Sequence, residues 1–416
     1  MTRTLFAGAT VFDGTGAAPA AADVVVENGR IVEVAPGLDG DERVDVSGKH
    51  LLPGLFDCHT HVMFSHVDFW KMLQTPFSLM FFEAMHNLRK TLEIGITTIR
   101  DAGGADLGVK TAVADGLIAG PRMQISIGMI SQTGGHGDEW MPSGVERLFQ
   151  PYPGSPGVIV DGAEEMRKKV RELIRNGADV LKVAVSGGVL SPRDDPRHAH
   201  FRIEELEVLV TEAEAAGRWV MAHAQASGGI KQAVRAGIRS IDHGLFLDDE
   251  AVELMLDRGT YLVPTLVAPG GVIRAAEGGA QIPEASLAKA REVIGYHQES
   301  FRKAVQAGVK IAMGTDSGVT PHGENLKELE LMAEGGMRPS EALVASTRTA
   351  AELMGLEAEL GTIEPGKRAD LVVVNGDPFE LDKLSDRIEA VYKDGEEFRP
   401  AGTATATSIT TTTTTE

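Results

Sequence analysis

Two histidines one residue apart, His59 and His61, close an apolar run at residues 52–61. Side chains of a β-strand alternate between its two faces, so both imidazoles project from one face and can bind the same metal ion. Such a pair is typical of a metal-dependent hydrolase. Because the chain contains 12 histidines, the pair alone is a weak indication, and its weight depends on the residues that follow.

Four more polar residues lie in or directly after apolar segments of strand-like composition: Lys182, His223, His243 and Asp316. Each histidine could instead be a core residue with satisfied hydrogen bonds, and Asp316 could cap a helix. Lys182 is harder to explain, because an unpaired ammonium is costly to bury and needs a partner or a changed charge. Together with the histidine pair, these residues predict a metal site.

Short apolar segments alternate with longer amphipathic ones from residue 51 to residue 355, as expected of βα units. The predicted strands lie at residues 52–57, 97–101, 123–130, 180–185, 220–223, 240–243, 261–265 and 310–315. Helices are predicted between them, for example at 163–176 and 203–216. We therefore predict an α/β fold, a TIM-like (β/α)8 barrel, whose active site lies at the carboxyl ends of the strands.

The two ends of the chain have a different pattern, in which short alternating strands are separated by turn residues. We predict that residues 1–50 and 356–400 fold together as a small β-sandwich domain. The barrel domain, residues 51–355, is then inserted between them. The threonine-rich tail at 401–416 has almost nothing to bury, and we predict that it is disordered.

Composition argues against several classes of protein. The net charge of −20 disfavours a nucleic-acid partner, because phosphate binding needs a basic surface. Apolar residues form 43% of the chain, but no stretch of about 18 of them is uninterrupted, so we expect no membrane segment. The N-terminus lacks an apolar signal segment, and the single cysteine, Cys58, excludes a cysteine metal cage. We expect a cytoplasmic protein with Cys58 packed in its core.

With this set of residues the chain resembles the amidohydrolase superfamily. The pattern of that family is His-x-His after strand 1, a lysine on strand 4, histidines after strands 5 and 6, and an aspartate after strand 8. The segment Pro-Gly-Leu-Phe-Asp-Cys-His-Thr-His at 53–61 is close to the opening motif of the family. Residues 131–138 and 186–192 look like the branch that contains binuclear zinc dipeptidases, prolidase-like enzymes and imidazolonepropionase-related hydrolases.

The resemblance implies a binuclear zinc centre. By matching positions, the first zinc ion would be held by His59, His61 and Asp316, and the second by His223 and His243. Lys182, carboxylated by carbon dioxide, would bridge both ions as an anionic carbamate. A zinc-bridged hydroxide would attack a carbonyl carbon, and Asp316 would carry the proton to the leaving nitrogen. The same ligands also suit manganese, cobalt or iron.

Substrate contacts are expected from loops. His136, in a glycine-flanked loop after strand 3, is the predicted oxyanion donor, with a flexible-loop histidine as the alternative. Related dipeptidases often have a tyrosine two residues after the strand 5 histidine, where this chain has Gln225, which can still donate a hydrogen bond. Arg193 after strand 4, and Arg274 in a glycine-rich, lid-like loop after strand 7, could clamp a substrate carboxylate. Asp57 is expected to support the metal ligands from beneath.

The leading hypothesis is a metal-dependent hydrolase of amide C–N bonds, a dipeptidase or N-acyl amino acid amidohydrolase acting on small carboxylate-bearing substrates. The alternative is a cyclic amidohydrolase similar to imidazolonepropionase, or a carbamate hydrolase. One-metal deamination is disfavoured, because mononuclear relatives generally lack the lysine and carry a glutamate after strand 5. A catalytically silent barrel is a third hypothesis, against which the costly polar groups at strand ends argue. We expect a small-molecule substrate and, as in relatives, a homo-oligomer.

Overall fold

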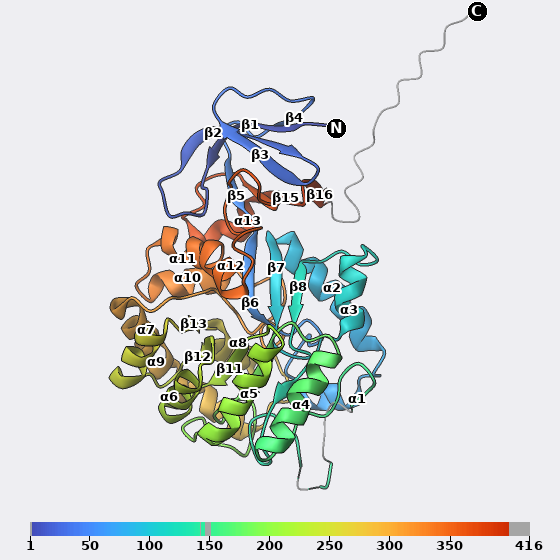
Figure 1. The fold of residues 1–416 in the computed structure, drawn as a ribbon, viewed down its shortest axis with the longest axis vertical. Helices are drawn as coiled ribbons and strands as arrows, with labels where there is room; N and C mark the ends of the chain where they lie inside the picture. Colours follow the sequence, from blue (N-terminus) through green and yellow to red (C-terminus); the bar gives the residue numbers. More distant parts are fainter. Residues whose placement is uncertain (1, 142, 146–150, 399–416) are drawn as a thin grey trace, which may run out of the picture.

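The computed structural model of the protein describes residues 2–141, 143–145 and 151–398. Figure 1 shows a small β-rich region, which contains the N-terminus, above a larger α/β region. The tail predicted at 401–416 lies outside the described residues. None of the helices in the described part of the chain is long and apolar enough to cross a membrane.

The smaller region is one mixed sheet of eight strands drawn from both ends of the chain. Its strands are β1 (Thr4–Val11), β2 (Ala20–Glu27), β3 (Arg30–Ala35), β4 (Glu42–Asp45), β5 (His50–Pro53), β14 (Leu371–Val374), β15 (Ile388–Lys393) and β16 (Glu396–Phe398). The antiparallel pair β14 and β5 joins the two chain ends. All eight strands are hydrogen-bonded as a single sheet, so the second layer of a sandwich and the domain boundaries stay predictions.

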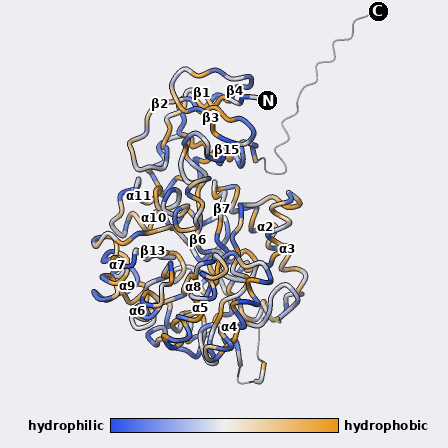
Figure 2. The backbone as a smooth tube through the Cα atoms, viewed as in Figure 1, coloured by the Kyte–Doolittle hydropathy of each residue, from blue (hydrophilic) through white to orange (hydrophobic). Residues whose placement is uncertain are grey.

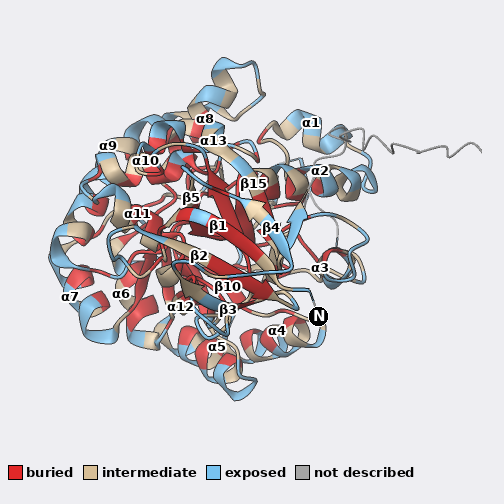
Figure 3. Ribbon diagram, turned by 90° about the horizontal axis from the view of Figure 1, so that it is seen from above, coloured by how far each residue is buried: buried red, intermediate tan, exposed pale blue. Residues whose placement is uncertain are grey.

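The larger region has a TIM-barrel-like α/β arrangement made of two parallel sheets, β6-β7-β8 and β9 to β13. Their bounds are β6 (Leu55–Thr60), β7 (Ile96–Asp101), β8 (Arg122–Ile125), β9 (Met129–Ile130), β10 (Leu181–Ala184), β11 (Val220–Ala224), β12 (Ser240–His243) and β13 (Tyr261–Val263). Figure 3 shows buried strands at the centre, surrounded by helices whose outer faces are exposed.

The surrounding helices are amphipathic, as the sequence predicts. In α4, for example, the buried residues Met166, Val170 and Leu173 recur at helical spacing. Figure 2 shows hydrophobic and hydrophilic residues interspersed along these outer helices. The helices are α1 (Phe69–Gln74), α2 (Leu79–Glu93), α3 (Leu107–Ala114), α4 (Ala163–Arg175), α5 (Ile203–Ala215), α6 (Ser227–Ala236), α7 (Asp249–Arg258), α8 (Val267–Glu277), α9 (Glu284–Ala307), α10 (Lys327–Glu334), α11 (Pro339–Ala345), α12 (Arg348–Met354), α13 (Leu384–Arg387) and the short 3-10 helix η1 (Leu381–Lys383).

Two predicted strands have the wrong bounds because each of them changes partners along its length. The strand predicted at 52–57 is divided at Gly54 into β5, in the end sheet, and β6, in the barrel. The strand predicted at 123–130 is divided into β8 and β9, which belong to different sheets. The break lies at Ile127, which adopts a left-handed φ of 69° that a strand cannot accommodate.

The strand predicted at 310–315 is wrong, although its backbone lies where a strand would. The N–H of Cys58 in β6 donates to Met313 O at 2.9 Å, and Leu262 N in β13 donates to Lys310 O at 2.8 Å. The N–H of Met313, however, donates to Ala345 O at the end of α11. A helix end thus takes a hydrogen bond that a regular ladder would need, while the segment still joins the two parallel sheets.

Candidate metal centre

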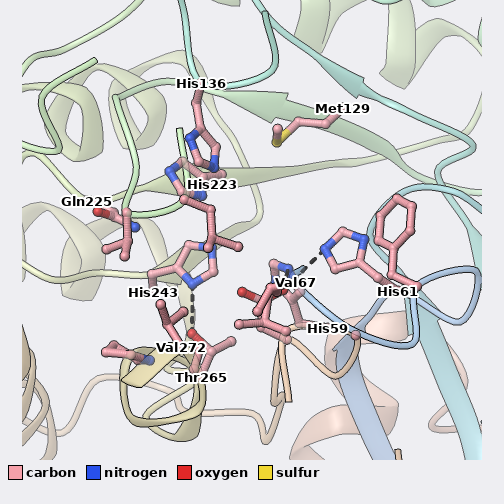
Figure 4. A pocket seen from close by; sticks show the side chains of 18 of the residues that line it. His59, His61, Val67, Met129, His136, His223, Gln225, His243, Thr265 and Val272 are labelled. Atoms are coloured by element: carbon pink, nitrogen blue, oxygen red, sulfur yellow. Dashed lines mark hydrogen bonds and ion pairs between the residues drawn. The ribbon is translucent and has the colours of Figure 1, made fainter. Parts of the chain in front are cut away.

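The predicted ligands converge at the carboxyl ends of the barrel strands. They line one cavity of about 210 Å³, shown in Figure 4. The ligands that line it are His59 from β6, His61 just after it, Lys182 from β10, His223 from β11, His243 from β12 and Asp316 from the segment after residue 315. Residues far apart in the sequence thus meet because parallel strands end at the same side of a barrel.

His59, His61 and Asp316 form the tightest cluster, with one ligand atom from each within 4.8 Å of the others. The Nε2 atoms of His59 and His61 lie 3.5 and 3.2 Å from Asp316 Oδ1. Burial raises the pKa of Asp316, but hydrogen bonds from the two imidazoles outweigh it and hold that pKa well below its usual value. A carboxylate oxygen and two imidazole nitrogens facing one another fit a divalent metal ion.

Each imidazole of this cluster is oriented through its other ring nitrogen. His59 Nδ1 lies 2.9 Å from Asp242 Oδ2, and His61 Nδ1 lies 2.8 Å from Gly103 O. Such partners fix the ring so that Nε2 is left for the metal. Asp57 supports the same strand, as expected: it accepts hydrogen bonds from the backbone N–H groups of His59 and Thr315 at 3.0 and 3.1 Å.

His223 and His243 lie beside this cluster, with ring centroids 4.6 Å apart. His243 Nδ1 contacts Thr265 Oγ1 at 2.7 Å, and His223 Nε2 contacts Gly187 O at 3.1 Å. Burial, followed by the positive charge of neighbouring histidines, lowers the pKa of both well below the usual value. The neutral imidazole is the form that binds metal, so these residues fit the role of ligands.

Lys182 has a partner that the sequence analysis missed. The lysine is 1% exposed, and its Nζ lies 2.9 Å from Oδ2 of Asp242, which is fully buried. Burial lowers the pKa of Lys182 although Asp242 opposes that shift. Arg100 in β7, also fully buried, contacts Oδ1 of the same carboxylate at 3.2 Å. Asp242 therefore links the lysine, an arginine and the Nδ1 atom of His59 into one network.

A signal for this network was present in the sequence. Arg100 and Asp242 are charged residues within the strands predicted at 97–101 and 240–243, as Lys182 is within the strand predicted at 180–185. Three residues of the site also have left-handed backbone angles that side chains rarely adopt: His243 at 77°, Thr265 at 54° and Asp316 at 62°. Strain of this kind clusters at functional sites, but it cannot be read from residue types.

Two of the predicted substrate contacts, His136 and Gln225, line the cavity. The His136 ring stacks on that of His223, with centroids 4.1 Å apart, and its Nδ1 lies 2.7 Å from Ser191 Oγ. Gly188 is required beneath it, because a Cβ there would lie 2.1 Å from the His136 ring. Gln225 is 4% exposed, and its Oε1 has no hydrogen-bond partner among the described residues.

The other two predicted contacts, Arg193 and Arg274, do not line the cavity. Arg193 is exposed and its guanidinium lies over the Trp140 ring at 4.8 Å. The expected lid-like loop after strand 7 is instead the helix α8. Its helical period turns Ala268 and Val272 into the cavity and leaves Arg274 exposed on the outer face.

The rest of the cavity wall is mainly apolar. It includes Phe64 and Phe69 from the segment after β6, Leu190 from the loop after β10, Leu245 after β12 and Val319 after residue 316. Among the described residues that line it, Lys182 is the only lysine and there is no arginine. Most polar groups thus lie on the floor where the strands end, while His66, His136 and Glu139 add polar groups from loops.

A buried His-His-Asp cluster on the strand ends of a TIM-barrel-like fold is characteristic of a metal-dependent hydrolase. The sequence matches the amidohydrolase family over residues 50–404, and the chain belongs to that family. It is 36% identical to the ochratoxinase of Aspergillus niger over 369 residues, 85% of this chain and 76% of the relative. It is a hydrolytic enzyme that acts on C–N bonds.

Two further relatives are similar over most of the chain. The crystal structure of a Xaa-Pro dipeptidase with bound methionine in its active site matches with a TM-score of 0.87 and 34% identity, covering 96% of this chain and all 100% of that one. Imidazolonepropionase of Geobacillus kaustophilus is 26% identical over 404 residues, 85% of this chain and 83% of the relative. The family is generally metal-dependent, which agrees with the His-His-Asp cluster.

Proposed function

We propose that this enzyme hydrolyses the amide bond of dipeptides or N-acyl amino acids with a binuclear zinc centre. The first ion would be held by His59, His61 and Asp316, and the second by His223 and His243. Bound there, the ions supply an acidified water and polarise the carbonyl group. The observation that carries the proposal is the His-His-Asp cluster beside the buried Lys182 on the floor of an apolar cavity.

Lys182 fits the role of a bridge once it is carboxylated. It lines the same cavity as the proposed ligands His223 and His243. Burial favours the neutral amine, which is the form that reacts with carbon dioxide. The carbamate would add an anion to a site that otherwise offers one carboxylate and four neutral imidazoles.

The side chains of the cavity then have separate tasks. Asp316 can accept a proton from water and return it to the leaving nitrogen, because its low pKa keeps it ionised. His136, oriented by Ser191 and the stacked ring of His223, can donate a hydrogen bond to the carbonyl oxygen. The amide of Gln225 can contact the substrate from the floor, and the apolar wall excludes water and receives an apolar group.

The similarity to the Xaa-Pro dipeptidase supports this choice of substrates, since a dipeptidase hydrolyses a peptide bond. The test combines metal analysis with a substrate panel. We expect about two zinc equivalents per chain, and turnover of dipeptides and N-acyl amino acids that a chelator abolishes. A protein that is active without metal would contradict the proposal.

A second candidate is hydrolysis of a cyclic amide or a carbamate. The observation that favours it is the absence of any arginine among the described residues lining the cavity, so a substrate carboxylate has no guanidinium partner there. Matched substrate pairs separate the candidates. If N-acyl amino acids are cleaved faster than their C-terminal amides, the first proposal holds, whereas turnover of cyclic amides or carbamates alone favours the second.

A further inference from the structure

A second pocket, of about 450 Å³, lies at the opposite end of the barrel strands from the metal centre. Its lining includes Val220 and Tyr261, the first residues of β11 and β13, and Arg239, which directly precedes β12. The proposed metal ligands lie at the other ends of these same strands. Whatever binds in this pocket is therefore separated from the hydrolytic site by the length of the barrel.

The pocket is basic in a chain whose net charge is −20. Four cationic side chains line it, namely Arg218, Arg239, Arg258 and Lys310, against one acidic residue, Glu214. Arg218 and Lys310 make no ion pair or side-chain hydrogen bond with any described residue. Like charges gathered without counter-charges repel one another, so the arrangement is costly unless something negative joins it.

The other two cations, Arg239 and Arg258, have partners that neutralise little of their positive charge. The Nη2 atom of Arg239 donates to the backbone oxygen of Glu352 at 2.7 Å, which carries no net charge. The ion pair of Arg258 is with its exposed sequence neighbour Asp257, at 3.8 Å. An exposed pair of this kind contributes little. Acidic side chains offset this charge in part, since Glu214 lines the pocket and Glu352 and Glu357 act on the pKa of Tyr261, but cations outnumber acids in the lining by four to one.

Buried hydrogen-bond donors also indicate that a ligand with acceptor groups binds in this pocket. The Nε atoms of Arg218 and Arg239 and the Nε1 atom of Trp219 are buried, and none has an acceptor among the described residues. A buried N–H without an acceptor is expensive, so such groups are rare unless a water or ligand completes them. All three atoms belong to residues that line this pocket. They would all be satisfied by a ligand that carries several oxygen acceptors.

Aromatic rings hold the cations in position. The Arg239 guanidinium lies over the Trp219 ring at 4.8 Å, and Lys310 Nζ lies over the Tyr261 ring at 5.1 Å. Cation–π contacts of this kind reduce the freedom of long side chains before a ligand arrives. A guanidinium so fixed binds phosphate or carboxylate oxygens with paired hydrogen bonds.

We propose that this pocket binds a small molecule carrying a phosphate group. The phosphate would lie between Arg218, Arg239 and Lys310, and the remaining volume, larger than inorganic phosphate needs, would hold the organic part. The ligand is distinct from the substrate, because the pocket has no contact with the metal-binding residues. The site is thus an effector or docking site for a phosphorylated metabolite.

The test is binding of inorganic phosphate and of glucose 6-phosphate to the metal-loaded enzyme at constant ionic strength, by calorimetry and tryptophan fluorescence. Trp219 is one of three tryptophans and the one that lines the pocket. We expect saturable binding, stronger for glucose 6-phosphate, with a fluorescence change that Trp219→Phe removes. The absence of saturable binding, or binding of succinate without either phosphate, would overturn the proposal.

The decisive variant is the double substitution Arg218→Gln with Lys310→Gln, because neither side chain makes an ion pair or side-chain hydrogen bond within the part of the chain that the structure describes, and Lys310 loses only its contact with the Tyr261 ring. It should weaken binding about tenfold or more, as expected when charge-assisted hydrogen bonds are lost. The matched control, Arg291→Gln with Lys303→Gln on α9, removes the same charge from another surface and should bind like the wild type. Equal binding by both double variants would place the anion elsewhere, for example at the metal centre, and would overturn the proposal.

Discussion

Charged side chains are buried and paired at one end of the barrel, whereas at the other end a half-buried arginine and an exposed lysine are unpaired. At the carboxyl ends of the strands, Asp242 neutralises Lys182 and Arg100 and also orients His59. At the amino ends, Arg218 and Lys310 have no charged partner among the described residues. The first arrangement balances its own charge, whereas the second is the one that we propose binds an anion. Ion pairing thus distinguishes the residues around the metal-centre cluster, which hold one another in position, from the residues that we propose bind a ligand.

Among substitutions at the two ends of the barrel, we expect the largest loss of activity from a change at Lys182. We expect Lys182→Ala to lower kcat about a thousandfold or more, because in the proposed mechanism several kcal/mol of transition-state stabilisation depend on a metal pair that Lys182 helps to hold. Metal content should fall with it, and added short carboxylates should restore part of the activity. Steady-state kinetics with elemental analysis checks this. Full activity in the variant would indicate that the lysine is only a partner of Asp242.

Asp242→Asn tests whether the ion pairs of Asp242 with Lys182 and Arg100 contribute to stability and activity. The change keeps the shape of the side chain but removes the carboxylate that pairs with the buried Arg100 and, before its proposed carboxylation, with Lys182, so we expect a loss of about 3–5 kcal/mol in the free energy of unfolding. Activity should also fall about 10- to 100-fold through misorientation of His59. Denaturant unfolding measures the first effect. The control, Asp249→Asn, alters an exposed ion pair with Lys303 and should change stability by no more than about 0.5 kcal/mol.

Gly188→Ala tests the role of His136 without touching the imidazole. The new methyl group would occupy the place of the ring, so we expect kcat to fall about tenfold or more as the oxyanion donor moves. The proposed metal ligands are unchanged, and metal content should stay the same. Gly228→Ala is the control, because its Cβ would make only an ordinary contact at 3.6 Å. Unchanged kcat in Gly188→Ala would remove His136 from the mechanism.

The smallest effect is expected at the two arginines outside the cavity. Arg193→Ala and Arg274→Ala should leave KM for a carboxylate-bearing substrate within about twofold, because exposed surface substitutions have small effects. Initial-rate kinetics over a range of substrate concentrations checks this. A tenfold rise in KM would mean that these residues reach the substrate after all, which would restore the carboxylate clamp predicted from the sequence.

The sequence predicted those parts of the site that are made of residue types able to bind metal. Histidines, a lysine and an aspartate at the ends of apolar segments led to the cavity, because parallel strands of a barrel end together. Asp242 and Arg100 were missed, since their importance depends on which residues face each other inside the barrel from strands that are not adjacent, β7, β10 and β12. Arg193 and Arg274 were misplaced for a related reason: exposure on α8 and its neighbouring loops depends on helical phase and packing.

The predicted strand bounds were wrong where the chain leaves one hydrogen-bonded partner strand and joins another. Nothing in the apolar run at 123–130 reveals that Ile127 adopts a left-handed backbone angle. Likewise, the segment at 310–315 has strand composition, but the end of α11 accepts one of its hydrogen bonds. Such features result from tertiary contacts, which local propensity does not encode.

Gly54 separates β5 from β6 and has a consequence for how the enzyme is made. Its N–H donates to Asp370 O at 2.7 Å, and a Cβ on it would lie 2.2 Å from Thr97 Oγ1. Gly54 thus joins the strand that carries His59 to β5, which pairs with β14, near the far end of the chain. Contacts so distant in sequence form slowly. We expect the enzyme to acquire metal only after almost the whole polypeptide has left the ribosome, so a nascent chain that stops before β14 would expose these histidines without a fixed geometry.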